Sequence, residues 1–192
     1  MAASVLAPMM PSLVQASNPC EPIVKSMRAQ LRSKAFRSRT VINPQQGPEV
    51  RIMGEYRLPD RVRLVRDREE TIAIRGKGTF TRRGNQAWQK SPTDVSDVVL
   101  NFTDAGMLEQ LDRDFVKSDC RLLNRDTIAG KPVLVYQYKV GAAEWSSVNK
   151  VWIGAADGLP YKVELISVHG GKNSKSVQII EYDTSIRIEV PQ

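Results

Sequence analysis

The chain has 192 residues, of which 41% are hydrophobic, 26% charged and 6% aromatic, and its formal net charge is +7. That length suits one domain with its own core, and no apolar run reaches the roughly 18–20 residues of a membrane-spanning helix. The single histidine and the two cysteines exclude a site of several imidazoles, a four-cysteine zinc site and a dense disulfide scaffold.

The first 16 residues differ in character from the rest of the chain. Residues 1–16 carry no charge and end in Val14-Gln15-Ala16, which resembles a secretory cleavage site before Ser17. The basic leader that a signal peptide normally carries is missing. We therefore interpret 1–16 as an export signal or a disordered tail, and 17–192 as a single domain.

The two cysteines, Cys20 and Cys120, give information on the cellular compartment in which the protein folds. Each could be an inert thiol in the core, which is the usual fate of a free cysteine. In an exported protein, however, two cysteines favour one disulfide. Closing a loop of about 100 residues would stabilise the fold by roughly 4–5 kcal/mol in the chain-entropy model. No Cys-x-x-Cys pair indicates a redox role.

Residues 18–35 have the pattern of an amphipathic helix. Asn18 can cap it and Pro19 suits its first turn. Val24, Met27 and Leu31 recur at helical spacing on one face, and basic residues lie on the other. The apolar stripe is narrow and lacks Trp and Phe, which favours packing on a core over binding at a membrane surface.

From residue 36 to residue 90, apolar and polar residues alternate with a period of two. In the segment 51–58, Ile52 and Tyr56 fall on one face, whereas Glu55 and Arg57 fall on the other. Such alternation predicts antiparallel strands with one dry and one wet face. The strands predicted in this half cover 51–58, 61–64, 71–74, 79–83 and 86–90.

Residues 91–113 interrupt the strands with one or two predicted helices, which Pro92 opens and Gly106 divides. The strands predicted after them cover 119–128, 132–140, 145–153, 161–168, 176–182 and 186–190. Asp157-Gly158 is a strong hairpin signal. Short turns throughout predict a meander of about ten strands, which curls strongly, so that helices must fill its dry concave face. The fold class is therefore α+β, with a curved antiparallel sheet around an N-terminal helix and middle helices.

Residues that could carry catalysis are scarce. His169 stands beside two glycines at a hairpin tip, where a solvated histidine is the simpler interpretation. Glu69 and Glu70 are neighbours on a strand and face opposite sides, and no nucleophile elbow, phosphate loop or metal motif occurs. We expect no enzyme activity, no metal and no cofactor.

The segment from Arg51 to Arg83 holds nine arginines and one lysine against five acids. Such a stripe can bind an anionic lipid surface, and the candidates for that role are Arg57, Arg61, Arg63 and Arg66. The interleaved acids also fit an ordinary solvated sheet face. Export argues against nucleic acid as a partner.

Four groups of residues carry a resemblance to a known family. They are Gly54-Glu55-Tyr56-Arg57-Leu58-Pro59-Asp60-Arg61-Val62-Arg63, Glu70-Thr71-Ile72-Ala73-Ile74 leading through Phe80 to Trp88-Gln89-Lys90-Ser91-Pro92, Lys150-Val151-Trp152-Ile153, and Asp157-Gly158-Leu159-Pro160-Tyr161-Lys162-Val163-Glu164 with the closing Tyr182 strand. Over residues 18–190, these segments resemble the periplasmic LolA/LppX-like superfamily of lipoprotein carriers and lipid-binding proteins.

The resemblance implies an unclosed half-barrel, in which a curved sheet wraps round helices and leaves an apolar cavity for acyl chains. In the lipoprotein carrier, an arginine directly before the early proline helps to hold the cavity closed. Leu58 occupies that place here, and Arg57, one residue earlier, belongs to the other face. We therefore expect a more general hydrophobic-ligand role than lipoprotein transfer itself.

The leading hypothesis is a non-enzymatic periplasmic protein that binds an acyl chain, a lipid or another hydrophobic small molecule between sheet and helices. The candidate lining residues are apolar side chains of the alternating strands, each of which could instead be ordinary core: Tyr56, Leu64, Ile74, Phe80, Trp88 and Trp152. Two alternatives stay open. One is an envelope protein-interaction module with a filled core, and the other is the anionic-lipid surface described above.

Overall fold

The structure is a computed structural model that describes residues 18–94, 96, 119–142 and 145–192. The predicted export signal at 1–16 lies outside the described residues. The helices predicted over 91–113 lie outside them almost entirely. The description below concerns the remaining chain.

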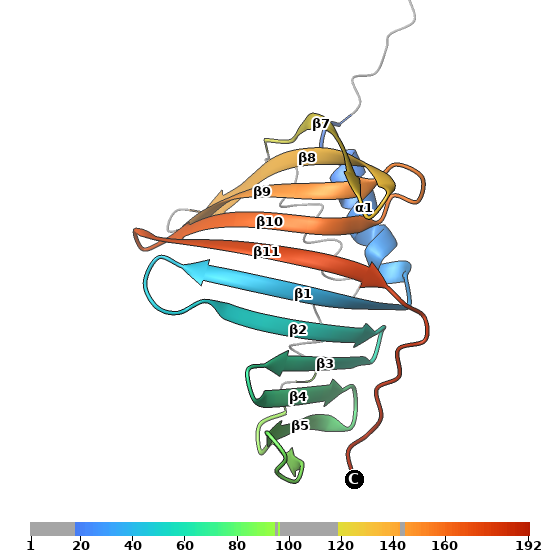
Figure 1. Cartoon of the computed structure of the whole chain (residues 1–192), viewed down its shortest axis with the longest axis vertical. Helices are drawn as coiled ribbons and strands as arrows, with labels where there is room; N and C mark the ends of the chain where they lie inside the picture. Colours follow the sequence, from blue (N-terminus) through green and yellow to red (C-terminus); the bar gives the residue numbers. More distant parts are fainter. Residues whose placement is uncertain (1–17, 95, 97–118, 143–144) are drawn as a thin grey trace, which may run out of the picture.

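The described residues form one α-helix and a single 11-stranded antiparallel sheet (Figure 1). The helix, α1, covers Glu21–Arg32. The strands are β1 (Ala35–Pro44), β2 (Val50–Arg57), β3 (Arg61–Arg66), β4 (Glu69–Ile74), β5 (Gly78–Arg83), β6 (Gln89–Lys90), β7 (Arg121–Ile128), β8 (Lys131–Ala142), β9 (Trp145–Gly154), β10 (Pro160–His169) and β11 (Lys172–Tyr182).

The strand order is β6-β5-β4-β3-β2-β1-β11-β10-β9-β8-β7, so the sheet is two meanders joined through β1 and β11. Their pairing runs from Phe36 opposite Tyr182 to Pro44 opposite Ser174. The prediction of one continuous meander is therefore wrong at one point. The strands β6 and β7 follow one another in the chain, but they form opposite edges of an unclosed sheet.

The helix α1 begins slightly later than the sequence predicts. Cys20 is its N-cap residue, and the Oδ1 atom of Asn18 accepts a hydrogen bond from the Cys20 N–H at 3.0 Å. Pro22, not Pro19, lies in the first turn, where a missing N–H costs nothing. Lys25 forms an ion pair with Glu21 one turn away, at 2.7 Å.

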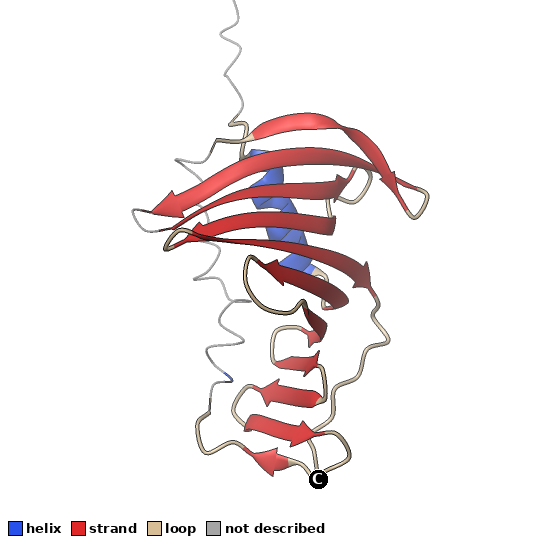
Figure 2. Cartoon of the chain, turned by 60° about the vertical axis from the view of Figure 1, so that its left-hand side comes forward, coloured by secondary structure: helices blue, strands red, loops and turns tan. Residues whose placement is uncertain are grey.

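The main core lies between α1 and the strands β8–β10. Ile23 and Val24 of the helix are buried against Tyr138, Val151 and Ile153 of the sheet. The predicted disulfide is confirmed, and Cys20 and Cys120 belong to this same cluster. Figure 2 shows these strands bending around α1, so the predicted curved half-barrel is present. The described part of the fold is mostly β, with α1 against the sheet, and the middle helices of the α+β prediction lie outside the described residues.

The residues after β11 do not form the strand predicted over 186–190. Residues 183–192, which we call the C-terminal strap, run instead past the ends of β1–β5 (Figure 1). Ile186 and Ile188 are buried against Ile72 and Ile74, and the Arg61 guanidinium donates a hydrogen bond to the Ile188 carbonyl at 2.6 Å. Their alternation reflects burial against a sheet face, not strand pairing.

Candidate functional site

The sheet has two chemically different faces, which the register defines. Residues directly opposite each other in paired strands share a face, and so do residues two apart in one strand. We call the face that packs on α1, with Tyr138 and Val151, the inner face, and the opposite one the outer face. Burial among apolar side chains raises the pKa of Tyr138 to about 12, so its hydroxyl stays neutral on this face.

Charged side chains are almost absent from the inner face of β1–β5 and β8–β11. Its central positions carry neutral groups such as Ser38, Thr40, Asn149, Gln178 and Ser176. Charge occurs only at the strand ends, at Arg66, Glu69, Arg83 and Lys172. This face can therefore contact an apolar molecule without burying an ion, which would be costly.

A groove of about 340 Å³ lies between α1 and the sheet. One side is formed by four residues on one stripe of α1, and the other by β8, β9 and the turn after β9. The lining residues are Pro22, Lys25, Ser26, Ala29, Leu134, Tyr136, Ile153, Gly154, Ala155, Asp157 and Gly158. We call it the helix groove. It lies where the sequence predicted a ligand site, between curved sheet and helix.

Ser26 is the lining residue whose side-chain hydroxyl is buried without a described hydrogen-bond partner. Its side chain is buried, and its Oγ atom has no hydrogen-bond partner in the described structure. An unpaired buried hydroxyl costs roughly 1–3 kcal/mol. A ligand with a polar end could satisfy this hydroxyl, which makes Ser26 a candidate for orienting what the groove holds.

Side-chain hydrogen bonds fix the turn that closes one end of the helix groove. Asp157 accepts hydrogen bonds from the Leu159 N–H at 3.0 Å and from the Tyr161 hydroxyl at 2.5 Å. Lys131 donates to the same Tyr161 oxygen at 3.0 Å, and this bond raises the pKa of Lys131. Desolvation, together with the bond to Asp157, raises the pKa of Tyr161. These hydrogen bonds are therefore present at neutral pH, with Lys131 charged and Tyr161 neutral.

The six predicted lining residues do not come together at one site. Tyr56 and Leu64 lie on the inner face with Val62 and Ala73. Ile74 and Phe80 lie on the outer face, since Phe80 is paired with Ile72.

The two tryptophans are also on the outer side. Trp88 packs on the cluster of Ile72, Ile74 and the C-terminal strap. Trp152 donates a hydrogen bond from Nε1 to Asp126 at 2.9 Å, and the Lys162 ammonium lies over its ring at 4.2 Å. None of the six lines the helix groove. Their role in binding a ligand stays a prediction.

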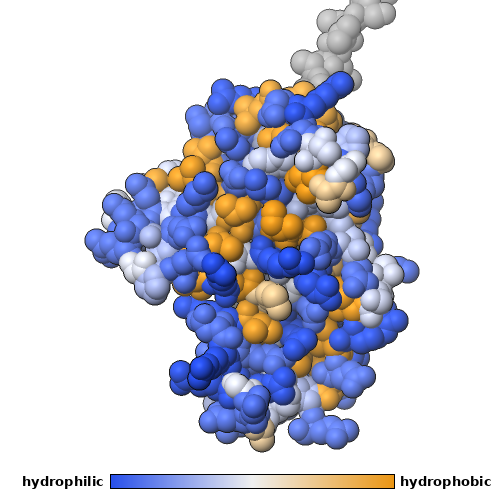
Figure 3. Space-filling view, viewed as in Figure 1, coloured by the Kyte–Doolittle hydropathy of each residue, from blue (hydrophilic) through white to orange (hydrophobic). Residues whose placement is uncertain are grey.

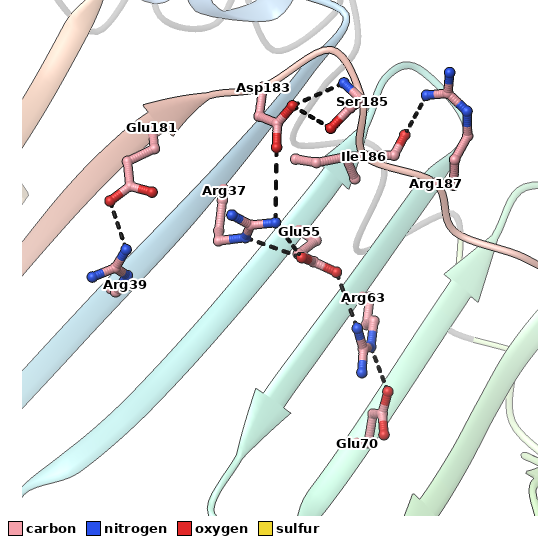
Figure 4. A network of polar contacts seen from close by, with 10 residues as sticks. All are labelled: Arg37, Arg39, Glu55, Arg63, Glu70, Glu181, Asp183, Ser185, Ile186 and Arg187. Atoms are coloured by element: carbon pink, nitrogen blue, oxygen red, sulfur yellow. Dashed lines mark hydrogen bonds and ion pairs between the residues drawn. The ribbon is translucent and has the colours of Figure 1, made fainter.

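An alternating series of acids and arginines crosses the outer face from the strap to β5. We call it the charge ladder: Asp183, Arg37, Glu55, Arg63, Glu70 and Arg82. Figure 4 shows its first five members and the neighbouring pair of Arg39 and Glu181. The Arg37–Glu55 and Glu70–Arg82 contacts measure 2.9 Å and 2.6 Å, and Arg63 bridges Glu55 and Glu70.

The ladder sets the ionisation of Glu70, its most buried acid. Burial alone would raise the pKa of Glu70, but the hydrogen bonds from Arg63 and Arg82 outweigh it and hold the pKa below its ordinary value. The Arg82 guanidinium also lies 4.5 Å from the centre of the Trp88 ring. These arginines are therefore used within the fold.

The four arginines predicted as an anionic-lipid surface lie on two different faces of the sheet and have different partners. Arg63 is bridged by two carboxylates, and Arg61 donates to Ile188 and contacts Asp60. Arg57 shares the outer face with them, whereas Arg66 lies on the inner face at the end of β3. The four do not form a single surface, because the odd spacing between Arg63 and Arg66 along β3 places Arg66 on the opposite face from the other three.

Figure 3 views the molecule from the side opposite α1 and thus shows the outer face. Its surface is mainly hydrophilic, with scattered hydrophobic spots. Met53 and Ile166, which are 49% and 51% exposed, belong to this face.

Among the described residues, no group of three or more His, Cys, Asp or Glu side chains could hold a metal ion. In the same part of the chain, no helix is long and apolar enough to cross a membrane.

A bent, unclosed antiparallel sheet with a helix on its uncharged face defines a half-barrel class of fold. Solved structures of this class include MucB. One chain of the Pseudomonas aeruginosa MucA/MucB complex matches with a TM-score of 0.50 and 15% identity, over 88% of this chain and 59% of that chain. A crystal structure of MucB matches with a TM-score of 0.52 and 19% identity, over 93% of this chain and 62% of that chain. The chain thus spans less than two thirds of the MucB chains that it matches.

A LolA superfamily protein from Nitrosomonas europaea also matches, over 86% of this chain and 92% of its own, at 11% identity. Its TM-score of 0.35 is too low to support further argument. The half-barrel fold that the predicted resemblance to the LolA/LppX-like superfamily implies is present, and the chain shares it with MucB. The sequence matches no protein-family model, and no curated protein sequence matches it significantly.

Sequence reasoning missed the residues that line the helix groove. It identified the apolar stripe of α1 that packs on the core, but not the adjacent stripe of Pro22, Ser26 and Ala29. A signal was present, since small residues next to an apolar stripe leave room between a helix and a sheet. The sheet residues of the groove could not be paired with α1 from the sequence, because that contact joins segments about 100 residues apart.

Proposed function

We propose that this protein acts by binding and not by catalysis, and that it holds a hydrophobic ligand, an acyl chain or a lipid, in the helix groove. The observation that carries the proposal is a groove of about 340 Å³ between α1 and a sheet face that bears no charge at its centre. Its volume is in the range of small-molecule sites.

The physical driving force would be the removal of apolar surface from water. Leu134, Tyr136 and Ile153 supply the apolar wall of the sheet, and Ala29 supplies that of the helix. Burial of such surface stabilises a complex by roughly 25 cal/mol for each Å². The Ser26 hydroxyl would then accept or donate a hydrogen bond to a polar end of the ligand.

We place this activity in the periplasm. A disulfide between residues 100 positions apart is typical of proteins that fold in an oxidising compartment. The resemblance of Val14-Gln15-Ala16 to a secretory cleavage site also supports export.

The test is to fill the helix groove from the helix side. Ala29→Phe adds a ring at a half-buried lining position, and Arg32→Phe adds the same ring at an exposed position of α1 outside the groove. Binding is measured by the fluorescence of phenylnaphthylamine, an apolar dye. We expect Ala29→Phe to weaken dye binding at least about tenfold, a loss of about 1.4 kcal/mol, and Arg32→Phe to leave it unchanged. Equal binding by both variants would refute the proposed site.

A second function, an envelope protein-interaction module, is supported by one comparison. The chain that matches this protein at a TM-score of 0.50 comes from a structure of the MucA/MucB complex. The exposed apolar side chains of the outer face, such as Met53 and Ile166, could serve such contacts. Native mass spectrometry of protein purified from the periplasm separates the two functions. A co-purified acyl species supports the carrier, and a co-purified polypeptide on otherwise empty protein supports the interaction module.

A further inference from the structure

A second, polar cleft lies at the other end of the sheet from α1. It has a volume of about 820 Å³ and is formed by the turn between β3 and β4, the end of β5 and residues 86–89. We call it the turn cleft. In the sheet order, β4 and β9 are six strand positions apart, and paired strands are about 4.8 Å apart, so the turn cleft is distinct from the helix groove.

Three arginines of the turn cleft differ from the arginines of the charge ladder in having no carboxylate partner among the described residues. Arg37, Arg63 and Arg82 are each paired with a carboxylate in the charge ladder. Arg66, Arg68 and Arg83 also line the cleft or flank its turn, but none of them has an ion pair with any residue that the structure describes. Their charge is therefore available to a ligand.

The remaining lining residues leave this positive charge in excess. Asp67 and Glu69 are the acids of the cleft, against four arginines. Arg82 forms a fixed wall, because Glu70 and the Trp88 ring hold its guanidinium. Gln86 and Gln89 add amide donors to the lining.

We propose that the turn cleft binds a ligand that bears phosphate groups. Arginine presents a planar fork of donors that fits phosphate oxygens in pairs, which lysine cannot do, and the cleft contains arginine and no lysine. Its volume admits more than one phosphate. Two sources of this chemistry fit: the headgroup of an anionic phospholipid, whose chains would lie along Leu64 and Tyr56 on the inner face, or a soluble phosphorylated molecule.

The test is calorimetric titration with inorganic pyrophosphate. The variant Arg66→Gln/Arg68→Gln/Arg83→Gln removes three charges from the cleft. The control Arg57→Gln/Lys150→Gln/Lys175→Gln removes three charges from the outer face, where Lys150 lies opposite Glu164 in the pairing of β9 with β10. Circular dichroism verifies that both variants fold.

We expect the cleft variant to bind pyrophosphate at least about tenfold more weakly, since even one charge-assisted hydrogen bond corresponds to that factor. We expect the control to lose less than about threefold. Equal losses in the two variants would overturn the proposal, since the attraction would then be general. An absence of binding by the wild-type protein both to pyrophosphate and to anionic vesicles would overturn it as well.

Vesicles identify the source of the phosphate. Flotation is measured with phosphatidylcholine vesicles, with and without phosphatidylglycerol. Binding that needs phosphatidylglycerol, is lost in the cleft variant and is displaced by pyrophosphate supports a lipid headgroup. Pyrophosphate binding without flotation supports a soluble ligand. Flotation that the cleft variant retains would contradict the proposal. Because Ala29→Phe leaves the turn cleft untouched, pyrophosphate binding by that variant separates failure of this site from failure of the helix groove.

Discussion

The inner and outer faces of the sheet are built from the same strands, yet they differ in charge and in what covers them. The inner face is uncharged at its centre, packs on α1 and leaves the helix groove. The outer face concentrates the arginines, and it stays stable because carboxylates pair with them in the charge ladder and the C-terminal strap covers its apolar end. The role that we propose for a side chain toward an apolar ligand thus depends on which face the side chain occupies, more than on its residue type.

The largest expected effect concerns the disulfide that holds α1 against the inner face. The variant Cys20→Ser/Cys120→Ser opens a loop closed over 100 residues, and we expect the free energy of unfolding to fall by about 3–5 kcal/mol. Because the bond ties α1 to the start of β7, dye binding in the helix groove should weaken too. Urea denaturation and dye titration measure both effects. An unchanged denaturation midpoint would show that α1 is held by packing alone.

The next effect concerns the strap on the outer face. Ile188 is 3% exposed, so Ile188→Ala should cost about 2–4 kcal/mol through the cavity that it leaves. Val190, two residues later and 42% exposed, provides the control, and Val190→Ala should change stability by less than about 0.5 kcal/mol. Dye binding in the helix groove should be the same in both variants. A loss of dye binding in Ile188→Ala would mean that the two faces are coupled.

A smaller effect should follow from the charge ladder. Glu70→Gln removes the carboxylate shared by Arg63 and Arg82, whose side chains are 38% and 33% exposed. We expect a loss of about 1–2 kcal/mol at neutral pH, less than for a fully buried pair because solvent screens both arginines. The exposed pair of Glu49 and Arg51 gives the control, in which Glu49→Gln should cost less than about 0.5 kcal/mol.

The pH dependence follows from the lowered pKa of Glu70. A carboxyl with a lower pKa in the folded state than its ordinary value of 4.5 contributes stability above pH 4.5 and loses it as the pH falls through the folded pKa. The stability difference between wild type and Glu70→Gln should therefore shrink below pH 4.5. Urea denaturation at neutral pH and at about pH 3 measures it. A difference that stays constant would exclude the ladder as its source.

The smallest effect has the opposite sign and concerns the inner face. Ser26→Ala removes a buried hydroxyl without a described partner, so the unliganded protein should gain up to about 1 kcal/mol. Thermal unfolding of protein stripped of lipid measures the gain. A destabilised variant would reveal that the hydroxyl is already bonded in the unliganded fold.

Much of the local structure could be predicted from the sequence. Asp157-Gly158 marks the turn between β9 and β10, and the two cysteines form the expected disulfide. The pairing of β1 with β11 could not be predicted, because Phe36 and Tyr182 meet only through long-range packing. Local alternation identifies the strands. It does not show which strands pair when they are far apart in the sequence.

The assignment of residues to faces was predicted least well. Ile74 was expected to line the inner cavity, but its partner across β3 is Arg61, which places both on the outer face. The run Ile72-Ala73-Ile74 does carry a signal for cover on both sides of the sheet, because a strand with apolar residues on both faces is buried on both. The second cover is the C-terminal strap, whose alternation was interpreted as a strand.

The central claim, that an apolar ligand lies between α1 and the sheet, is tested most directly by photolabelling. A diazirine-bearing palmitate is bound to the protein and irradiated, and the labelled peptides are mapped by mass spectrometry. The account predicts labels on residues 22–29 of α1 and on the groove positions of β8 and β9, and it predicts that Ala29→Phe removes them. Labels confined to the outer face, or labels that persist in Ala29→Phe, would contradict it.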